Sequence, residues 1–391
     1  MLKKISVTQL RKGMYINDLK CGWFTHPFAL NRFKLENESD IRKIIAAGVK
    51  EIEIDTAKGL DLFVEKRKTE NNELRKVIDQ RPADKVERVS ARQEVGQAKI
   101  VFAEAGMFIT EMMANVKMGQ HVELEQVTPV INKMSASILR NPNALLGLSR
   151  IRVMDKYTFE HSVSFSVLMM AFAKSMGLSQ KIIKEVGIGG LLHDIGKTLT
   201  PNEILNKPGK LTEQEFLIMK EHVVDSRKIL EKTAGLSQIA MDIAAQHHEK
   251  FDGNGYPLGL KGDQISLYGQ MSAVVDVYDA LTADRCYHVG KEPSEVLKLL
   301  LKWGGSHFNP ELVQKFIQSV GIYPAGSLVL LSNYHLATVI DINENMLKPQ
   351  VELFLNTKKR CYVPRKIINL SACDDIKILS VESYAKWNIQ Q

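Results

Sequence analysis

The segment Y-T-F-E-H-S-V-S-F-S-V-L-M-M-A-F-A-K-S-M, residues 157–176, decides the fold of the middle of this chain. Apolar residues recur in it at spacings of three and four, as they do on the buried side of an α-helix. His161 falls on the same stripe as Phe165 and Phe172, so its imidazole is expected to face the core. The segment therefore predicts a helix that lies inside a helical bundle and carries one histidine inward.

Two further helices are predicted directly downstream. Ser179 is placed to cap the first of them, which carries His193 on its apolar side and is expected to stop at Gly196. The sequence T-E-Q-E at 212–215 is a capping box that opens the next helix. The inward residues predicted for that helix are Phe216, Met219, His222, Ser226 and Ile229.

A fourth and a fifth helix complete the predicted bundle. The fourth covers residues 237–249 and brings His247 to the same face as its apolar residues. The fifth covers residues 270–283, is small and apolar nearly all round, and buries Asp276. Each helix of the bundle therefore carries a histidine or an aspartate toward the core.

The flanks of the bundle have a different character. A strand at 50–55 and a helix at 39–47 predict a small α+β domain, and residues 65–99 are strongly charged. Strands are predicted at 327–331 and 336–340. The fold class expected is mainly α, with a small N-terminal α+β domain and a short C-terminal β-rich appendage. The domains expected are an N-terminal domain of unknown role at 1–64, a charged linker region of helical character at 65–135, the bundle at 136–320, and a β-rich subdomain at 321–391.

Composition excludes several classes of protein. Of the 391 residues, 45% are hydrophobic and 25% are charged, which is ordinary for a globular protein. No apolar run approaches the ~18 residues that span a bilayer, and the first residues do not form a secretory signal. We therefore expect a cytoplasmic protein without a membrane partner. The net charge of +7 is spread along the chain, which argues against binding a nucleic acid polymer. The four cysteines form no C-x-x-C pair.

Histidines and aspartates converge on the inner faces of the predicted helices. The set consists of His161, His193, Asp194, His222, His247, His248 and Asp276. Buried carboxylates are costly unless a positive charge lies near them, and a metal cluster supplies that charge. Nitrogen and oxygen donors without thiolate suit iron, manganese or zinc. Seven ligands exceed the needs of one ion, so the pattern favours two ions bridged by Asp194.

Three motifs then point to a family. They are H-D-I-G-K at 193–197, H-H-E-K-F-D-G-N-G-Y-P at 247–257, and V-V-D-V-Y-D-A-L-T at 274–282. In this order they resemble the HD-GYP domains of bacterial signalling proteins, over about residues 150–320. This resemblance implies an HD-type helical bundle.

The N-terminal region resembles a domain that often precedes HD-GYP domains. Its matching stretches are Q-L-R-K-G-M-Y at 9–15, H-P-F at 26–28 and I-D-T-x-K-G at 54–59. The role of that domain is uncharacterised, so it adds no expected chemistry.

The resemblance implies hydrolysis of cyclic di-GMP or of 3′,3′-cyclic GMP-AMP. The seven residues above match the family's metal ligands, with two divalent ions, iron or manganese, as the expected cofactors and other divalent ions left open. Asp194 and Lys197 are the expected catalytic residues, and an ion-activated hydroxide is expected to attack phosphorus. The substrate contacts expected are Lys197, Gly255, Tyr256, Arg285 and His288.

The chain departs from the family pattern at three positions. Tyr157 stands where some members have a glutamate that recruits a third metal ion, so two ions are expected here. His288 replaces a basic residue, and Gln270 stands where many members have arginine. The last two changes leave the choice between the two dinucleotides open.

Two alternatives to this enzyme stay open. One is a different HD-type phosphohydrolase acting on nucleotides, and the other is a sensor or scaffold that binds the dinucleotide without cutting it. The GYP loop, residues 251–257, offers either backbone contacts to substrate or a surface for a protein partner. The sequence does not determine the oligomeric state.

Overall fold

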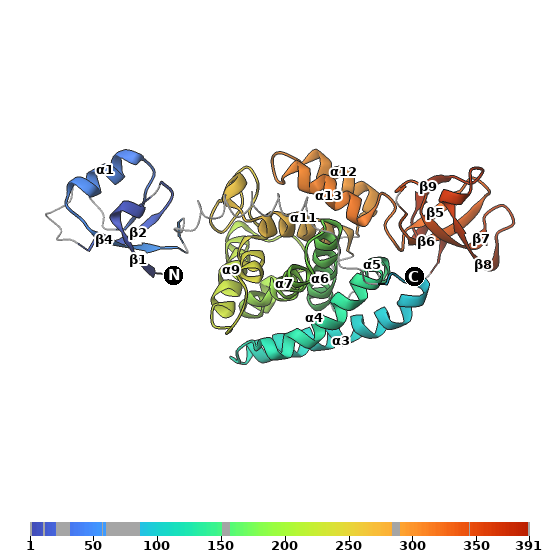
Figure 1. Cartoon of the computed structure of the whole chain (residues 1–391), viewed down its shortest axis with the longest axis horizontal. Coiled ribbons are helices and arrows are strands. Elements are labelled where there is room, and N and C mark those ends of the chain that lie inside the picture. Colours follow the sequence, from blue (N-terminus) through green and yellow to red (C-terminus); the bar gives the residue numbers. More distant parts are fainter. Residues whose placement is uncertain are drawn as a thin grey trace.

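The computed structural model describes residues 2–10, 12–20, 32–56, 58–59, 87–150, 157–283, 290–343 and 345–389. Figure 1 shows three parts in a row, with a small N-terminal unit (blue), a helical bundle in the middle and a C-terminal sheet (red). This is the predicted fold class, mainly α with two small strand-rich flanks, so that prediction is confirmed.

The N-terminal unit is an antiparallel sheet covered by one helix. Its strands are β1 (Leu2–Ser6), β2 (Tyr15–Asp18), β3 (Phe33–Lys34) and β4 (Glu51–Asp55), in the order β1-β4-β2-β3. A 3-10 turn, η1 (Val7–Gln9), follows β1, and helix α1 spans Glu38–Ala46. Ile16, Ile44 and Ile54 are fully buried between sheet and helix. The strand and the helix predicted here are both present.

The bundle is built from α-helices of different lengths and short 3-10 turns. Its first helices are α3 (Ala91–Lys117), α4 (Leu124–Arg140), α5 (Pro142–Leu148), α6 (Tyr157–Ser175) and α7 (Gln180–Leu192). Then follow η3 (Ile195–Leu199), α8 (Asn202–Leu205), α9 (Glu213–Leu230), α10 (Gln238–Gln246), η4 (Gly262–Gln264), α11 (Leu267–Thr282), α12 (Pro293–Lys302) and α13 (Pro310–Val320). None of the described helices combines the length and the apolar character needed to cross a bilayer.

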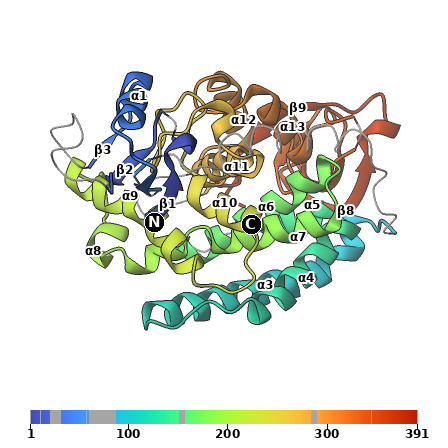
Figure 2. The ribbon, with the colours of Figure 1, turned by 60° about the vertical axis from the view of Figure 1, so that its left-hand side comes forward.

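Helices α3 and α4 belong to the bundle, although the sequence places most of them in a linker. They run side by side along one face of it (Figures 1 and 2). Val101, Ile109 and Ile131 are buried in the same apolar core as α6 and α7. The bundle therefore begins near Ser90, whose side chain caps α3, and residues 60–86 lie outside the described part of the chain.

The starts predicted at Ser179 and Thr212 are confirmed by their caps, α11 begins three residues earlier than predicted, and two predicted helix ends are wrong. Ser179 accepts a hydrogen bond from the Ile182 amide, and the capping box at Thr212 is formed. Helices α7 and α10 end at Leu192 and Gln246, earlier than predicted. The chain turns away after α7 because the Gly196 amide donates to Ser226 Oγ on α9 at 2.8 Å instead of continuing the helix.

The predicted inward face of α9 is wrong at its first turn. Phe216 is 44% exposed, whereas His222 and Ser226 are buried. The neighbouring Leu217 and Ile218 are exposed as well. Met219 is partly buried, and the first fully buried residue of α9 is His222.

The C-terminal unit is a five-stranded antiparallel sheet. Its strands are β5 (Leu328–Leu331), β6 (His335–Asp341), β7 (Gln350–Asn356), β8 (Cys361–Asn369) and β9 (Ile378–Glu382), in the order β8-β7-β6-β5-β9, with 3-10 turns η5 (Leu370–Ala372) and η6 (Ala385–Trp387). Asp341 on β6 accepts hydrogen bonds from the side chains of Asn141 and Asn143 at the start of α5. The sheet is therefore joined to the bundle by buried polar contacts.

Candidate metal centre

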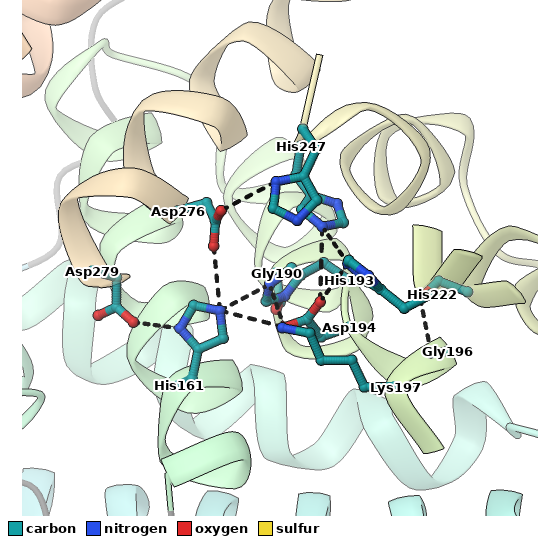
Figure 3. Close-up of polar contacts among 12 residues, drawn as sticks. His161, Gly190, His193, Asp194, Gly196, Lys197, His222, His247, Asp276 and Asp279 are labelled. Atoms are coloured by element: carbon teal, nitrogen blue, oxygen red, sulfur yellow. Dashed lines mark hydrogen bonds and ion pairs between the residues drawn. The ribbon is translucent and has the colours of Figure 1, made fainter. Parts of the chain in front are cut away.

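Seven side chains from five helices meet in the middle of the bundle. His161 comes from α6, His222 from α9 and Asp276 from α11. The other four follow the last residues of α7 and α10, as the pairs His193 with Asp194 and His247 with His248. All except His248 have buried side chains. The structure thus brings together the complete set predicted from the sequence. Figure 3 labels all of these residues except His248.

Asp194 lies at the centre of this set, and its two carboxylate oxygens face different imidazoles. Oδ2 lies 3.4 Å from His161 Nε2 and 3.3 Å from His193 Nε2. Oδ1 lies 3.3 Å from His222 Nε2 and 3.8 Å from His247 Nε2. The carboxylate therefore stands between two groups of nitrogen donors.

The remaining ligands divide in the same way. The group that we call the carboxylate half is His161, His193 and Asp276. The group that we call the imidazole half is His222, His247 and His248. Within each group the ligand atoms lie within 4.8 Å of one another. Asp276 Oδ1 is 3.4 Å from His161 Nε2 and its Oδ2 is 3.5 Å from His248 Nδ1, so Asp276 also touches both halves.

Backbone carbonyls orient three of the imidazoles. In each case Nδ1 lies within hydrogen-bond distance of the carbonyl oxygen three residues earlier in the chain. The pairs are His193 with Gly190 at 2.8 Å, His222 with Met219 at 2.5 Å, and His247 with Ala244 at 3.0 Å. A carbonyl can only accept, so Nδ1 carries the proton and the Nε2 lone pair points to the centre, as a metal ligand requires.

His161 is oriented differently, by a carboxylate. Its Nδ1 lies 2.5 Å from Asp279 Oδ2, one helical turn beyond Asp276 on α11. Burial disfavours the charged imidazole, but Asp194, Asp276 and Asp279 outweigh it and raise the pKa of His161 to about 10. Asp279 is therefore the residue that orients this candidate ligand.

The imidazole half has the opposite electrostatics. Burial lowers the pKa of His222 to about 4 and that of His248 to about 3, and it holds the pKa of His247 well below its usual value. Desolvation penalises the charged ring more than the nearby carboxylates favour it. These three rings are therefore neutral near pH 7, which is the form that binds metal ions.

The donor set fits a pair of divalent cations. Asp194 Oδ1 is buried and has no hydrogen-bond partner among the described residues. Native proteins rarely leave such an atom unsatisfied. Although burial raises the pKa of Asp194, His193 and Lys197 hold it well below its ordinary value, so an ionised oxygen faces the imidazole half. Nitrogen and oxygen donors of this kind suit first-row transition metals.

Lys197 is positioned by the turn that follows α7. Its ammonium donates to Asp194 Oδ2, and its side chain is 20% exposed, so it reaches both the centre and solvent. Gly196 lets this turn approach α9, because a Cβ at this position would lie 2.1 Å from the His222 carbonyl oxygen. The glycine of H-D-I-G-K therefore places the lysine.

The GYP loop covers the exposed side of the imidazole half. Gly255 packs on the backbone of 249–250, where a Cβ would lie 2.2 Å from the Lys250 amide nitrogen. The Tyr256 amide donates to the His248 carbonyl at 3.1 Å, and the two rings lie 4.7 Å apart. The glycine predicted as a substrate contact thus has a packing role, and Tyr256 lies against a candidate ligand.

Glu249 is a residue whose role the sequence did not reveal. It is 1% exposed and accepts hydrogen bonds from the Leu258 amide at 2.7 Å and the Leu260 amide at 2.9 Å. Burial raises its pKa to about 7, although these amides favour the charged form. The only available signal was its place directly after the paired histidines, and its carboxylate fixes the end of the GYP loop.

Four other positions that the sequence singled out have different outcomes. Gln270 is buried, donates to the Ile265 carbonyl at 3.0 Å and accepts from Asn309 at 2.9 Å, so it is a structural residue. Arg285 and His288 lie outside the described residues. The side chain of Tyr157 is also outside the described part of the chain.

Comparison with protein families gives two matches that together span most of the chain. Residues 133–312 match an HD domain, and residues 2–127 match a domain of unknown function, DUF3391. The second match extends through α3, well past residue 64.

Individual relatives agree with these matches. The chain is 37% identical to a cyclic di-GMP phosphodiesterase of Pseudomonas aeruginosa over 100% of its own length and 94% of the relative. It is 40% identical to a 3′3′-cGAMP-specific phosphodiesterase of Vibrio cholerae over 40% of this chain and 36% of that one. A solved HDG"Y"P protein of Bdellovibrio bacteriovorus aligns with 81% of this chain and 98% of its own, with 17% identity and a TM-score of 0.48. The chain therefore belongs to the HD-GYP family of HD-domain proteins and carries a DUF3391 domain at its N-terminal end.

Proposed function

We propose that this protein hydrolyses a cyclic dinucleotide second messenger, cyclic di-GMP or 3′,3′-cyclic GMP-AMP. The observation that carries the proposal is the central carboxylate of Asp194, whose two oxygens face two separate groups of donors. The full-length relative that acts on cyclic di-GMP supports the same substrate class. The ligand set is complete, which favours an enzyme over a non-cutting sensor.

Two divalent ions, iron or manganese, are the proposed cofactors. His161, His193 and Asp276 would hold one, His222, His247 and His248 the other, and Asp194 would be shared. When bound, two such ions lower the pKa of water and neutralise the phosphoryl oxygens of a phosphodiester. The backbone and carboxylate contacts of the histidines keep the ligand atoms aimed at the centre before any ion binds.

Lys197 is the proposed partner of the reacting phosphate. Its ammonium is fixed beside Asp194 and partly open to solvent, so it can bind a nonbridging phosphate oxygen as a point charge. In the reaction water adds to phosphorus, one ribose P–O bond breaks, and the departing ribose oxygen takes up a proton. The first product is a linear dinucleotide. Arg285, His288 and the GYP loop stay proposed substrate contacts.

The test uses protein purified without oxygen and loaded with manganese or ferrous iron. Cyclic di-GMP and 3′,3′-cyclic GMP-AMP are offered separately, and the products are resolved by chromatography. We expect one or both to be linearised, with Asp194→Asn as the inactive control. Tight binding of a dinucleotide without any turnover, at full metal loading, would favour the sensor alternative and overturn the proposal.

A further inference from the structure

A group of three side chains lies on the outer side of the imidazole half. The ring of Phe216 is 6.4 Å from that of Tyr256, edge to face, and Tyr256 in turn lies 4.7 Å from His248. The Lys220 ammonium is 4.6 Å from the Phe216 ring centre and 5.2 Å from that of Tyr256. We call Phe216, Lys220 and Tyr256 the aromatic rim. It joins the first turns of α9 to the GYP loop.

Packing alone does not account for the rim. A single exposed apolar side chain needs no explanation, and Leu217 is such a case at 60% exposure. Phe216 differs because its ring, 44% exposed, touches a tyrosine that itself touches a candidate metal ligand. A residue that only anchored the GYP loop would be expected to bury its ring.

The positive charge of the rim, the Lys220 ammonium, is also available to a ligand. Among the residues that the structure describes, no carboxylate forms an ion pair with Lys220, although other lysines of α9 and its neighbours have partners, such as Lys228 with Asp225. A cation held over two aromatic rings stays attractive to an anion. The rim thus offers a partly exposed aromatic ring and a positive charge next to the site where a phosphodiester would react.

We propose that the aromatic rim is the subsite for the half of the substrate that is not being cut. A nucleobase stacks on the open face of Phe216, and the Lys220 ammonium faces the second phosphodiester of the ring. This inference rests on the proposed function. Base stacking on an aromatic side chain accepts any purine, so the rim strengthens binding of a cyclic dinucleotide without choosing between its two forms.

The first test compares Phe216→Ala with Leu217→Ala, the matched control one residue away. Each is assayed on cyclic di-GMP and on methyl p-nitrophenyl phosphate, a phosphodiester without a nucleobase. Phe216→Ala removes one stacking partner of the nucleobase. We expect it to lower kcat/KM for cyclic di-GMP about tenfold relative to kcat/KM for methyl p-nitrophenyl phosphate, mainly through a higher KM for cyclic di-GMP. Phe216→Trp should recover most of the ratio. Equal ratios for Phe216→Ala and Leu217→Ala would overturn the base subsite.

The second test measures binding without turnover. Calorimetric titration with a phosphorothioate analogue of cyclic di-GMP compares Lys220→Met, which keeps the aliphatic stem, with Lys228→Met elsewhere on α9. We expect weaker binding and a smaller salt dependence for Lys220→Met only. If the wild-type protein cleaves the simple diester but neither binds nor cleaves the dinucleotide, both the proposed function and the rim subsite are contradicted. If the rim variants cleave the dinucleotide as well as the wild type does, only the rim subsite is contradicted.

Discussion

The two halves of the candidate metal centre are built from similar residues but are held in place differently. In the imidazole half, His222 and His247 are oriented by neutral backbone carbonyls. In the carboxylate half, His161 is oriented by the charged Asp279. The fold therefore places extra negative charge on one side of Asp194 only. The comparison teaches that two ions bound here would not be equivalent, and that the carboxylate half should hold its ion more tightly.

The same difference is visible in the protonation of the rings. Burial leaves the rings of the imidazole half neutral, with the pKa of His222 lowered to about 4. Three carboxylates act against burial at His161 and raise its pKa to about 10. A cation in the carboxylate half thus takes a place where the fold already favours positive charge. Asp194 and Asp276 also act on the rings of the imidazole half, but burial outweighs them there.

The largest fall in turnover is expected from Asp194→Asn, because the carboxylate of Asp194 serves both halves. A neutral amide cannot share charge between two cations as a carboxylate does. We expect turnover to fall by more than about a hundredfold with helical content retained, because the site is held by backbone contacts. Kinetics, metal analysis and circular dichroism check this. Activity within threefold of wild type with both ions bound would contradict the shared role of Asp194.

Lys197→Ala should give the next largest effect and leave both halves loaded. Loss of a positioned cation at a developing phosphoryl charge costs about a hundredfold in turnover. Lys197→Arg should restore only part of it, since the planar guanidinium presents fixed donors. Saturation kinetics and metal analysis are the measurements. A rise in KM with unchanged kcat would make Lys197 a docking charge instead.

Asp279→Asn tests the comparison directly, because it changes the support of the carboxylate half alone. Removal of such a supporting hydrogen bond weakens metal binding about 10- to 100-fold. We expect one of two bound ions to be lost first in a competition titration with a chelator. Asp374→Asn, at a side chain that is 97% exposed, is the control for loss of a charge. Equal weakening of both ions would show that the halves are not independent.

The sequence predicted the centre well because helical spacing determines which side chains face inward. His161 shares its stripe with Phe165 and Phe172, and all three are buried. The same reasoning failed for Phe216, which is 44% exposed, because periodicity does not reveal which turns of a helix other elements cover. It also failed at the ends of α7 and α10, and after α7 the Gly196 amide bonds to Ser226 on α9 instead of continuing the helix.

Contacts between loops and the bundle were beyond sequence reasoning for a different reason. Glu249 binds amides nine and eleven residues further on, and Asp341 binds asparagines about two hundred residues earlier. No local period links such positions. Charged residues of this kind are normally exposed, so their burial follows only from the tertiary structure.

The smallest effect on activity is expected from Phe165→Leu in the carboxylate half. Phe165 is fully buried and its ring stacks on His193 at 4.0 Å. The hydrogen bond between His193 Nδ1 and the Gly190 carbonyl persists in the variant and is sufficient to keep the ligand oriented. We therefore expect turnover to change less than about threefold, while removal of buried ring atoms lowers the free energy of unfolding by about 1–3 kcal/mol.

Tyr256→Leu is the matching change in the imidazole half. Comparing it with Phe165→Leu separates the effect of an aromatic ring on packing from its effect on the position of a candidate metal ligand. Tyr256 lies 4.7 Å from the His248 ring and is partly exposed, so its loss should cost less stability than Phe165→Leu. His248, by contrast with His193, has no backbone carbonyl bonded to a ring nitrogen among the described contacts, and its Nδ1 faces Asp276. Without the tyrosine its ring is held less firmly, so metal in the imidazole half should weaken more. Chelator titration measures metal affinity and urea unfolding measures stability in both variants. A larger loss of metal affinity in Phe165→Leu than in Tyr256→Leu would contradict the role of Tyr256 in holding a ligand.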